Sequence, residues 1–158
     1  MSLSDRRFAL LFPLLLACCG FQSAYSPSGS ASKFYNKVNV QAANDHDSFL
    51  LMQELEDRIG SSGNQFELQF DLTIESDASV VIKTGETARF SVLGTVNYIL
   101  KDNATTRIVG QGQIKNFTSY SAAGSTVETR AAKQDAHARL MRVLADQIAN
   151  HLVTADIQ

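Results

Sequence analysis

The hydrophobic pattern changes its period along the chain, and this change restricts the fold to one that combines a sheet with helices. From Phe66 to Ile74 apolar and polar residues alternate strictly, which is the pattern of a strand with one buried and one hydrated face. From Ala136 to Val153 the apolar residues recur at helical spacing instead. A sheet covered on one face by amphipathic helices buries both sets of apolar side chains.

The other segments extend this pattern into a complete fold. Ser125 and Glu128 have the spacing of a capping box, and the helix that follows is expected to run for about thirty residues. Gly110 and Gly112 within a predicted strand indicate a bulge or the close approach of another backbone. The predicted strands are 34–40, 66–82 with a break at 76–77, 88–100 and 105–117, and the first predicted helix is 47–59.

The predicted fold is therefore α+β. It is a two-layer sandwich in which a four-stranded, mostly antiparallel sheet carries two helices on one face, in the order β-α-β-β-β-α. The chain has 158 residues, of which 44% are apolar, and this balance excludes wholesale disorder. Its net charge of −2 provides no attraction for nucleic acid, so no nucleic-acid partner is expected.

The N-terminus predicts export and lipid attachment. A basic leader ending at Arg7 precedes ten apolar residues, too few for the roughly 20 that a membrane-spanning helix needs. Leu-Ala-Cys-Cys then resembles a bacterial lipobox, with Cys19 as the lipidated residue and Cys18 as the alternative. Several acyl chains, palmitate among them, anchor a protein far more firmly than one does. No Asp follows either cysteine, which indicates the outer membrane and a domain that faces the periplasm.

These features divide the chain into three parts. Residues 1–18 are predicted to be the signal peptide, and the small polar residues up to 32 a lipidated tether. Residues 33–158 form one periplasm-facing domain. Because Cys18 and Cys19 are adjacent and are the only cysteines, neither a disulfide framework nor a cysteine-rich metal site is expected.

No catalytic constellation is recognisable, so a non-enzymatic protein without cofactor or metal is predicted. There is neither a nucleophile elbow nor a glycine-rich phosphate loop. His46 stands between two aspartates at a predicted helix start, where capping explains it better than metal binding. His137 and His151 lie on one predicted helix about 21 Å apart, too far to share a ligand. The acids Glu54, Glu56 and Asp57 are interpreted as a hydrated helix face.

Basic residues are the better lead to a ligand. Lysine and arginine donate charge-assisted hydrogen bonds to phosphate. Ordinary surface charge that protects strand edges is the alternative interpretation. The basic residues on predicted strands or their turns are Lys83, Arg89, Lys101, Arg107 and Lys115, and they are candidates for binding a phosphate-bearing ligand.

Two stretches resemble the LptE family of lipoproteins that assemble lipopolysaccharide (LPS). The run from Cys19 to Tyr25, CGFQSAY, is similar to the start of mature family members, and it favours Cys19 over Cys18 as the lipidated residue. The stretches 135–140 and 144–148 look like the family's last helix. The resemblance implies a four-stranded sheet packed by two helices, with no enzymatic activity.

The resemblance also implies a partner. Family members plug the outer-membrane β-barrel subunit of the LPS translocon, so an LptD-like barrel and LPS are the expected partners. The resemblance implies that basic residues on strands and loops contact LPS. In this sequence the candidates for LPS binding are Lys83, Arg89, Lys101 and Arg107. An auxiliary lipoprotein of another envelope lipid-transport complex is the alternative. A lipid-anchored hydrolase that uses His46, Glu54 and Asp57 is a third possibility.

Overall fold

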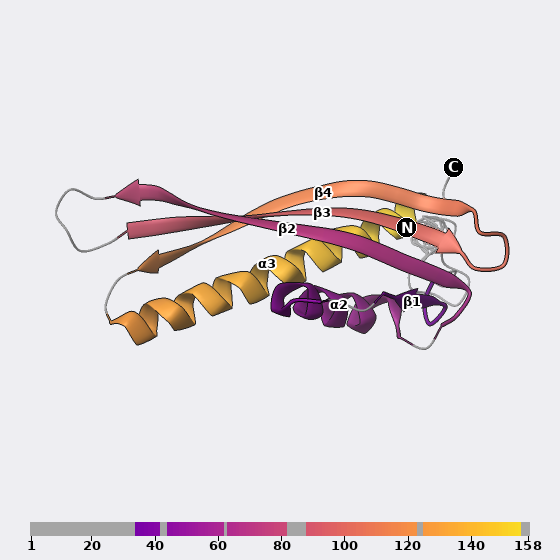
Figure 1. Ribbon diagram of the computed structural model, residues 1–158, viewed down its shortest axis with the longest axis horizontal. Helices are drawn as coiled ribbons and strands as arrows, with labels where there is room; N and C mark the ends of the chain where they lie inside the picture. Colours follow the sequence, from indigo (N-terminus) through magenta and orange to yellow (C-terminus); the bar gives the residue numbers. More distant parts are fainter. Residues whose placement is uncertain (1–33, 42–43, 62, 82–87, 123–124, 156–158) are drawn as a thin grey trace, which may run out of the picture. The chain divides into compact units, whose positions relative to one another are not determined.

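The computed structural model describes residues 34–41, 44–61, 63–81, 88–122 and 125–155, apart from the side chains of 78–81, 88 and 155. Both helices lie on the same face of a single four-stranded sheet (Figure 1). The predicted α+β sandwich and its element order are confirmed. The elements are β1 (Val38–Val40), α2 (His46–Ile59), β2 (Phe66–Val81), β3 (Ala88–Asp102), β4 (Ile108–Ala122) and α3 (Thr126–Ala155).

The sheet is mixed, because one of its pairings is parallel. The strand order is β1-β2-β3-β4; β2 and β4 both pair antiparallel with β3, whereas β1 pairs parallel with β2. Parallel neighbours need a crossover connection, and α2 supplies it. The hairpins give the antiparallel majority that the sequence predicted, and the crossover adds the parallel strand.

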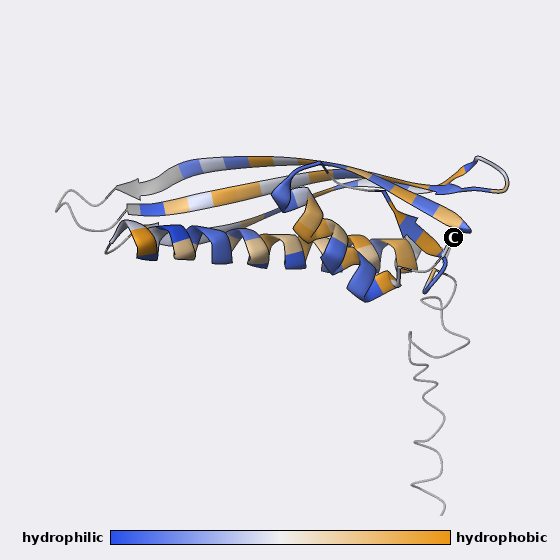
Figure 2. Cartoon of the chain, turned by 60° about the horizontal axis from the view of Figure 1, so that its bottom comes forward, coloured by the Kyte–Doolittle hydropathy of each residue, from blue (hydrophilic) through white to orange (hydrophobic). Residues whose placement is uncertain are grey.

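Strand register assigns each residue of the long strands to a face. Leu68, Leu100 and Gly110 stand side by side in one row, and their neighbours along each strand point the other way. Even-numbered residues therefore face the helices and odd-numbered residues face away. Figure 2 shows the resulting alternation of hydrophobic and hydrophilic bands along the strands. The buried strand residues of the core are Val38, Val40, Leu68, Val92, Val96, Tyr98 and Leu100.

The long helix α3 crosses the sheet and lies very close to it. Its stripe of Leu140, Leu144 and Ile148 is buried against the strands. A Cβ atom built on Gly94 would lie 2.9 Å from Leu144 Cδ1, so glycine at this position of β3 permits the close approach. At Gly112 the same Cβ would lie 3.0 Å from the Tyr98 hydroxyl, so a side chain approaches this glycine and not the backbone that the sequence predicted. The register shift between Leu100 and Lys101 lies next to Gly110 and agrees with the alternative prediction of a bulge.

Side chains cap the first turn of both helices, and α2 begins one residue before its predicted start. Asp45 accepts hydrogen bonds from the Ser48 amide at 3.0 Å and from the Ser48 hydroxyl at 2.5 Å, and these bonds lower the pKa of the Asp45 carboxyl. Before α3, the Ser125 amide donates to Glu128 Oε2 at 2.7 Å and the Glu128 amide to Ser125 Oγ at 3.4 Å. Both bonds of the predicted capping box are present.

Several strand boundaries differ from the predictions. β1 is limited to Val38–Val40, whereas the sequence indicated 34–40, and β3 continues to Asp102 instead of ending at 100. β4 runs from Ile108 to Ala122, whereas the sequence indicated 105–117. Its last residues lack apolar alternation, but they pair with β3 as far as Ala88–Ala122. β2 continues without a break through Ser76 and Asp77, and its one register shift lies between Ala78 and Val80. Pairing with a neighbouring strand extends β2 and β4 beyond what their own residues indicate.

Candidate interaction surface

The odd-numbered residues of the three long strands form one continuous polar surface, here called the open face. Neither helix covers it, because both pack on the opposite side of the sheet (Figure 1). Amides and hydroxyls predominate, with charged side chains mainly on β2. Its central rows, read from β2 to β4, are Gln69–Ile99–Gln111, Asp71–Asn97–Gln113, Thr73–Thr95–Lys115, Glu75–Leu93–Phe117 and Asp77–Ser91–Ser119.

Side chains of the open face hydrogen-bond across the strands. Gln113 Nε2 donates to Asn97 Oδ1 at 2.8 Å. Lys101 Nζ donates to Gln69 Oε1 at 3.0 Å, and Gln69 Nε2 donates in turn to Glu67 Oε1 at 2.9 Å. Amides and hydroxyls both donate and accept, so this surface can meet many polar partner groups.

An exposed pair of apolar side chains interrupts the open face. Leu93 and Phe117 stand directly opposite each other on β3 and β4. Phe117 keeps 69% of its surface exposed and Leu93 keeps 37%. An exposed aromatic ring within a polar surface is a typical contact point for a partner protein. Neither residue is a candidate in the sequence, although Leu93 lies between the inward-facing positions Val92 and Gly94 and so falls on the hydrated face.

The candidate basic residues do not form one cluster. Lys101 lies near the end of β3 and pairs with Ile108 of β4. Arg107 is the residue immediately before Ile108. Arg89 lies twelve residues from Lys101 on the same strand, about 40 Å away at roughly 3.3 Å per residue. Lys83, Cys18 and Cys19 lie outside the described residues. A single phosphate group therefore cannot contact both Lys101 and Arg89.

The turn that carries Arg107 is held by Asp102. Asp102 Oδ1 accepts hydrogen bonds from the amides of Ala104 at 2.8 Å and Thr105 at 2.9 Å. The backbone bond from Thr105 is the main reason that the pKa of Asp102 is lowered. Thr106 has a φ of 57°, a left-handed conformation that completes the reversal toward β4. Arg107 is consequently held beside the end of β3.

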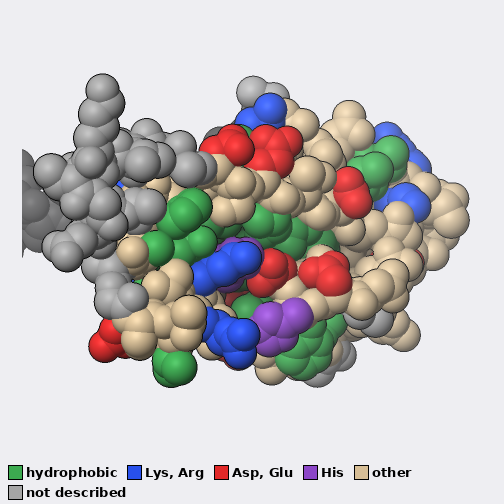
Figure 3. All heavy atoms as spheres, turned by 60° about the vertical axis from the view of Figure 1, so that its left-hand side comes forward, with side chains coloured by type: hydrophobic (Ala, Val, Ile, Leu, Met, Phe, Trp, Pro, Cys, Tyr) green, Lys and Arg blue, Asp and Glu red, His purple; other side chains and the backbone are tan. Residues whose placement is uncertain are grey.

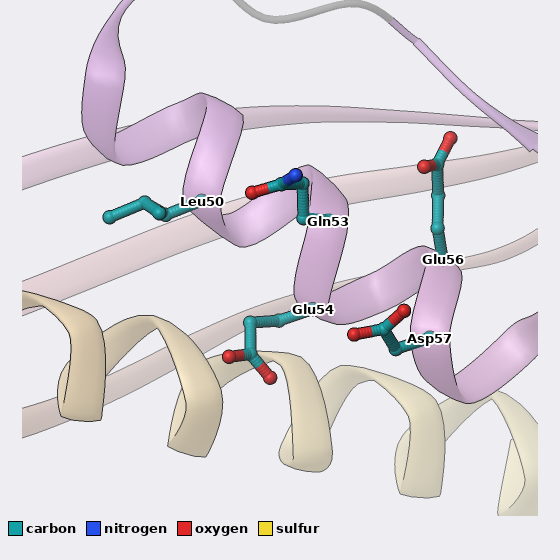
Figure 4. A pocket seen from close by; sticks show the side chains of 5 residues that line it. All are labelled: Leu50, Gln53, Glu54, Glu56 and Asp57. Atoms are coloured by element: carbon teal, nitrogen blue, oxygen red, sulfur yellow. The ribbon is translucent and has the colours of Figure 1, made fainter.

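The acidic residues of α2 do not form a catalytic pair. They border a shallow hollow of about 240 Å³, but the side chains of Glu54, Glu56 and Asp57 point in different directions (Figure 4). Glu54 Oε2 accepts from Arg58 Nη1 at 2.7 Å, and Arg58 Nε donates to Asp146 Oδ1 of α3 at 2.5 Å. The bond to Asp146 is the largest cause that raises the pKa of Arg58. These charges join the two helices.

The histidines also contact other elements of the fold. His137 Nδ1 lies 2.9 Å from Asp47 Oδ2, which ties α3 to the start of α2. His151 Nδ1 hydrogen-bonds the hydroxyl of Tyr98, whose pKa is raised by burial. His46 is the first residue of α2 after its Asp45 cap. Within the described parts of the chain, no three histidine, cysteine or acidic side chains come together as metal ligands.

The end of the sheet far from β1 has a thinner cover. α2 lies under only one half of the sheet, whereas α3 continues under the other half (Figure 1). Here Phe90 stacks on Tyr120 with ring centroids 5.3 Å apart, and both rings are half-buried. Figure 3 shows hydrophobic side chains in a hollow, with acidic, basic and histidine side chains around them. Of the described helices, none is apolar over a length that would cross a membrane.

Comparison with known proteins gives one family match and several solved structures of the same fold. The family model described as LptE, lipopolysaccharide-assembly, matches residues 35–152. A search of curated proteins gives no significant match. A Caulobacter crescentus chain described as a lipoprotein superposes with a TM-score of 0.66 at 22% identity, covering 80% of this chain and 94% of that one.

Two further solved structures share the fold. A minor lipoprotein from Acinetobacter baumannii has a TM-score of 0.56 at 17% identity, with 77% and 95% of the two chains covered. The rare lipoprotein B from Shewanella oneidensis has the same TM-score and coverage at 12% identity. At such identities the likeness extends to the arrangement of strands and helices.

Proposed function

This chain belongs to the lipopolysaccharide-assembly family LptE, and we propose that it is a non-catalytic outer-membrane lipoprotein that plugs an LptD-like translocon barrel. In this role it aids assembly of the barrel and delivery of LPS to the cell surface. The domain contributes a rigid surface of defined polarity. No covalent chemistry is required of it.

The observation that carries the proposal is the open face. The interior of a large outer-membrane barrel is polar, so a plug must present groups that can hydrogen-bond to the lumen wall. Asn97, Gln113 and Thr95 provide such groups at the centre of the open face. Because they are uncharged, burying them against polar partners costs less than burying ions. The helices on the other face keep the sheet rigid while this surface is in contact.

The lipid anchor provides the second part of the proposal. A lipid on Cys19, or on Cys18 as the alternative, holds the domain at the periplasmic side of the outer membrane. The tether of residues 19–32 lets the domain reach a barrel mouth nearby. Attachment to the same membrane raises the effective concentration of the domain near its partner.

The basic residues provide the third part. Lys101 and Arg107 at one end of β3 are proposed to hold a phosphate of LPS. Arg89, with Lys83 nearby in the sequence, is proposed to make a separate contact at the other end. Charge reversal at Lys83, Arg89 and Arg107 together is expected to weaken LPS binding while the far-UV circular dichroism stays native. Unchanged LPS affinity in a folded variant would remove these residues from the proposal.

Co-purification from native outer membranes tests the barrel partner. The tagged full chain should retain one large β-barrel protein after detergent extraction. The double variant Thr95→Arg/Asn97→Arg should lose that protein, because two long cations enter the centre of the open face. The matched control Gln53→Arg/Asp57→Arg changes exposed positions on α2 and should retain it.

Two other results would count against the proposal. Retention of the barrel by the open-face variant would mean that another surface makes the contact. Recovery of a transporter ATPase or a periplasmic protein in place of a barrel would favour an auxiliary lipoprotein of another envelope lipid-transport complex. Separately, Cys19→Ala should abolish lipid attachment; persistent lipidation of that variant would identify Cys18 as the acceptor.

A further inference from the structure

The outer edge of β4 carries backbone groups that no strand pairs. β4 is the last strand of the sheet order, so within the described residues only its side toward β3 has a strand beside it. The strand is fifteen residues long, and its register shift lies at its start, opposite Leu100 and Lys101. Long unpaired edges of this kind accept additional strands.

Two hydrogen bonds between β2 and the β1 segment, carried through the register, identify which residues of β4 point outward. In antiparallel sheets, alternate residues direct both their N–H and C=O groups to the same neighbour. On β2, the Leu68 carbonyl accepts from Gln41 at 2.9 Å and the Phe66 amide donates to the Lys37 carbonyl at 3.0 Å, so even-numbered residues face the β1 side. Directly opposite residues of the paired strands carry this alternation across β3 to β4. The backbone N–H and C=O groups of odd-numbered β4 residues are therefore predicted to point outward, away from β3.

Two contacts on β4 agree with this assignment. The Phe117 amide donates to the side chain of Asn116 at 2.8 Å, and the Ser119 carbonyl accepts from Arg139 at 3.3 Å. The Phe117 amide and the Ser119 carbonyl both belong to odd-numbered residues. Each forms its hydrogen bond with a side chain and not with the backbone of β3. The outward groups of Gln111, Gln113 and Lys115 have no such protein partner among the described residues.

A trough lies beside this uncapped part of the edge. It has a volume of about 450 Å³, and Gln113 and Ile114 of β4 form one wall. The floor comes from the exposed side of α3, which projects past the strand. Its residues from α3 are Gln147, Asn150, His151 and Thr154.

We propose that the β4 edge from Gln111 to Lys115 is a docking site for an extended segment of a partner polypeptide, which adds to the sheet as a fifth strand. Backbone N–H and C=O groups are the obligatory bonding groups of every peptide, so the edge itself specifies an extended chain. Lys115 is the only charged residue of β4, and Phe117 follows it on the same face. The best-matched segment carries an acidic residue and, two positions away, an apolar one.

A second copy of this chain fits the edge poorly. His151 and Leu152 approach Gly112 and Gly110, so the C-terminal half of α3 lies directly beneath β4. Paired strands are about 4.8 Å apart. Two packed helices need about 8–10 Å between their axes. Pairing β4 with β4 of another copy would drive the two α3 helices into each other, whereas a single strand without a helix beneath it fits.

The test uses the full chain purified in detergent and a synthetic nine-residue peptide. The peptide alternates Thr and Val, with one Phe and a Glu two residues from it, and carries a fluorescent label for anisotropy. Binding should slow amide hydrogen exchange at Gln111, Gln113 and Lys115. A peptide N-methylated at the alternate residues that face β4 should not bind, because it lacks the required donors.

A matched pair of variants isolates the backbone bond. Gln113→Pro removes an N–H that points away from β3, so the fold should persist while the peptide Kd rises about tenfold, equivalent to about 1.4 kcal/mol. Gln113→Ala keeps that N–H and should bind within about twofold of the wild type. Circular dichroism of both variants establishes that they are folded.

Several results would overturn the proposal. These are absence of peptide binding, equal binding by the proline and alanine variants, or protection confined to β2. Self-association of the wild-type chain that Gln113→Pro abolishes would assign the edge to a second copy. Because peptide binding and barrel co-purification are separate measurements, this site can fail while the proposed LPS role stands, and the reverse also holds.

Discussion

Along β3, neighbouring residues belong to two different surfaces. Val92, Val96 and Leu100 face the helices and are fully buried, whereas Leu93 and Asn97 on the opposite face are exposed. The inner face is apolar and closely packed, and the open face consists mainly of amides, hydroxyls and charges. One strand therefore stabilises the fold with one half of its residues and leaves the other half available for recognition.

The largest expected effect comes from the same substitution on the two faces of β3. Leu100→Ala removes a buried side chain and should lower the free energy of unfolding by about 2–5 kcal/mol. Leu93→Ala should change it by about 0.5 kcal/mol, because that side chain is already partly hydrated. Chemical denaturation of both variants measures the difference. Equal losses would show that the open face is also part of the packed core.

A smaller effect is expected from adding one methyl group at two glycines. Gly94→Ala places Cβ 2.9 Å from Leu144 Cδ1 and should destabilise the protein by about 1–2 kcal/mol, since the buried side chains of Leu140 and Leu144 must shift. Gly110→Ala meets its nearest atom at 3.6 Å and should be neutral or slightly stabilising. Thermal unfolding distinguishes the two variants. A neutral Gly94→Ala would mean that α3 does not rely on this close contact.

The smallest effect concerns the helix cap that positions α2 over the inner face. Asp45→Ala should cost about 1 kcal/mol at pH 7. Because the folded-state pKa of Asp45 lies below its ordinary value of 3.8, its stabilisation is present above that value and is lost as pH falls through the folded pKa.

The control for this pH dependence is Asp45→Asn, which keeps a capping oxygen but does not titrate. The stability difference between the wild type and Asp45→Asn should shrink when the pH is lowered from 7 to about 3. Denaturant midpoints at both pH values measure it. A difference that stays constant would show that the Asp45 charge does not contribute.

Local sequence patterns predicted the fold well wherever a residue's environment depends on its neighbours in the sequence. The alternation of β2 and the capping box before α3 are examples. The end of β4 was missed because Ser119 and Ser121 carry no apolar signal and are held by pairing with β3. The parallel pairing of β1 likewise depends on how α2 crosses the sheet, which periodicity does not record.

The site was less predictable, because it depends on long-range register. Arg89 and Lys101 are both basic strand residues in the sequence, yet the structure places them at opposite ends of β3. The pairing of Leu93 with Phe117 joins positions on different strands. The contact between His137 and Asp47 spans ninety residues of sequence. Local periodicity assigns a face to each residue but does not identify its cross-strand neighbour.

The most direct test of the central claim is photo-crosslinking in native outer membranes. A photoreactive residue at Asn97 samples the open face, and one at Gln53 samples the exposed side of α2. We expect Asn97 to give a strong adduct with the translocon barrel and Gln53 a weak one. A barrel adduct from Gln53 with none from Asn97 would contradict the assignment of the open face as the contact surface.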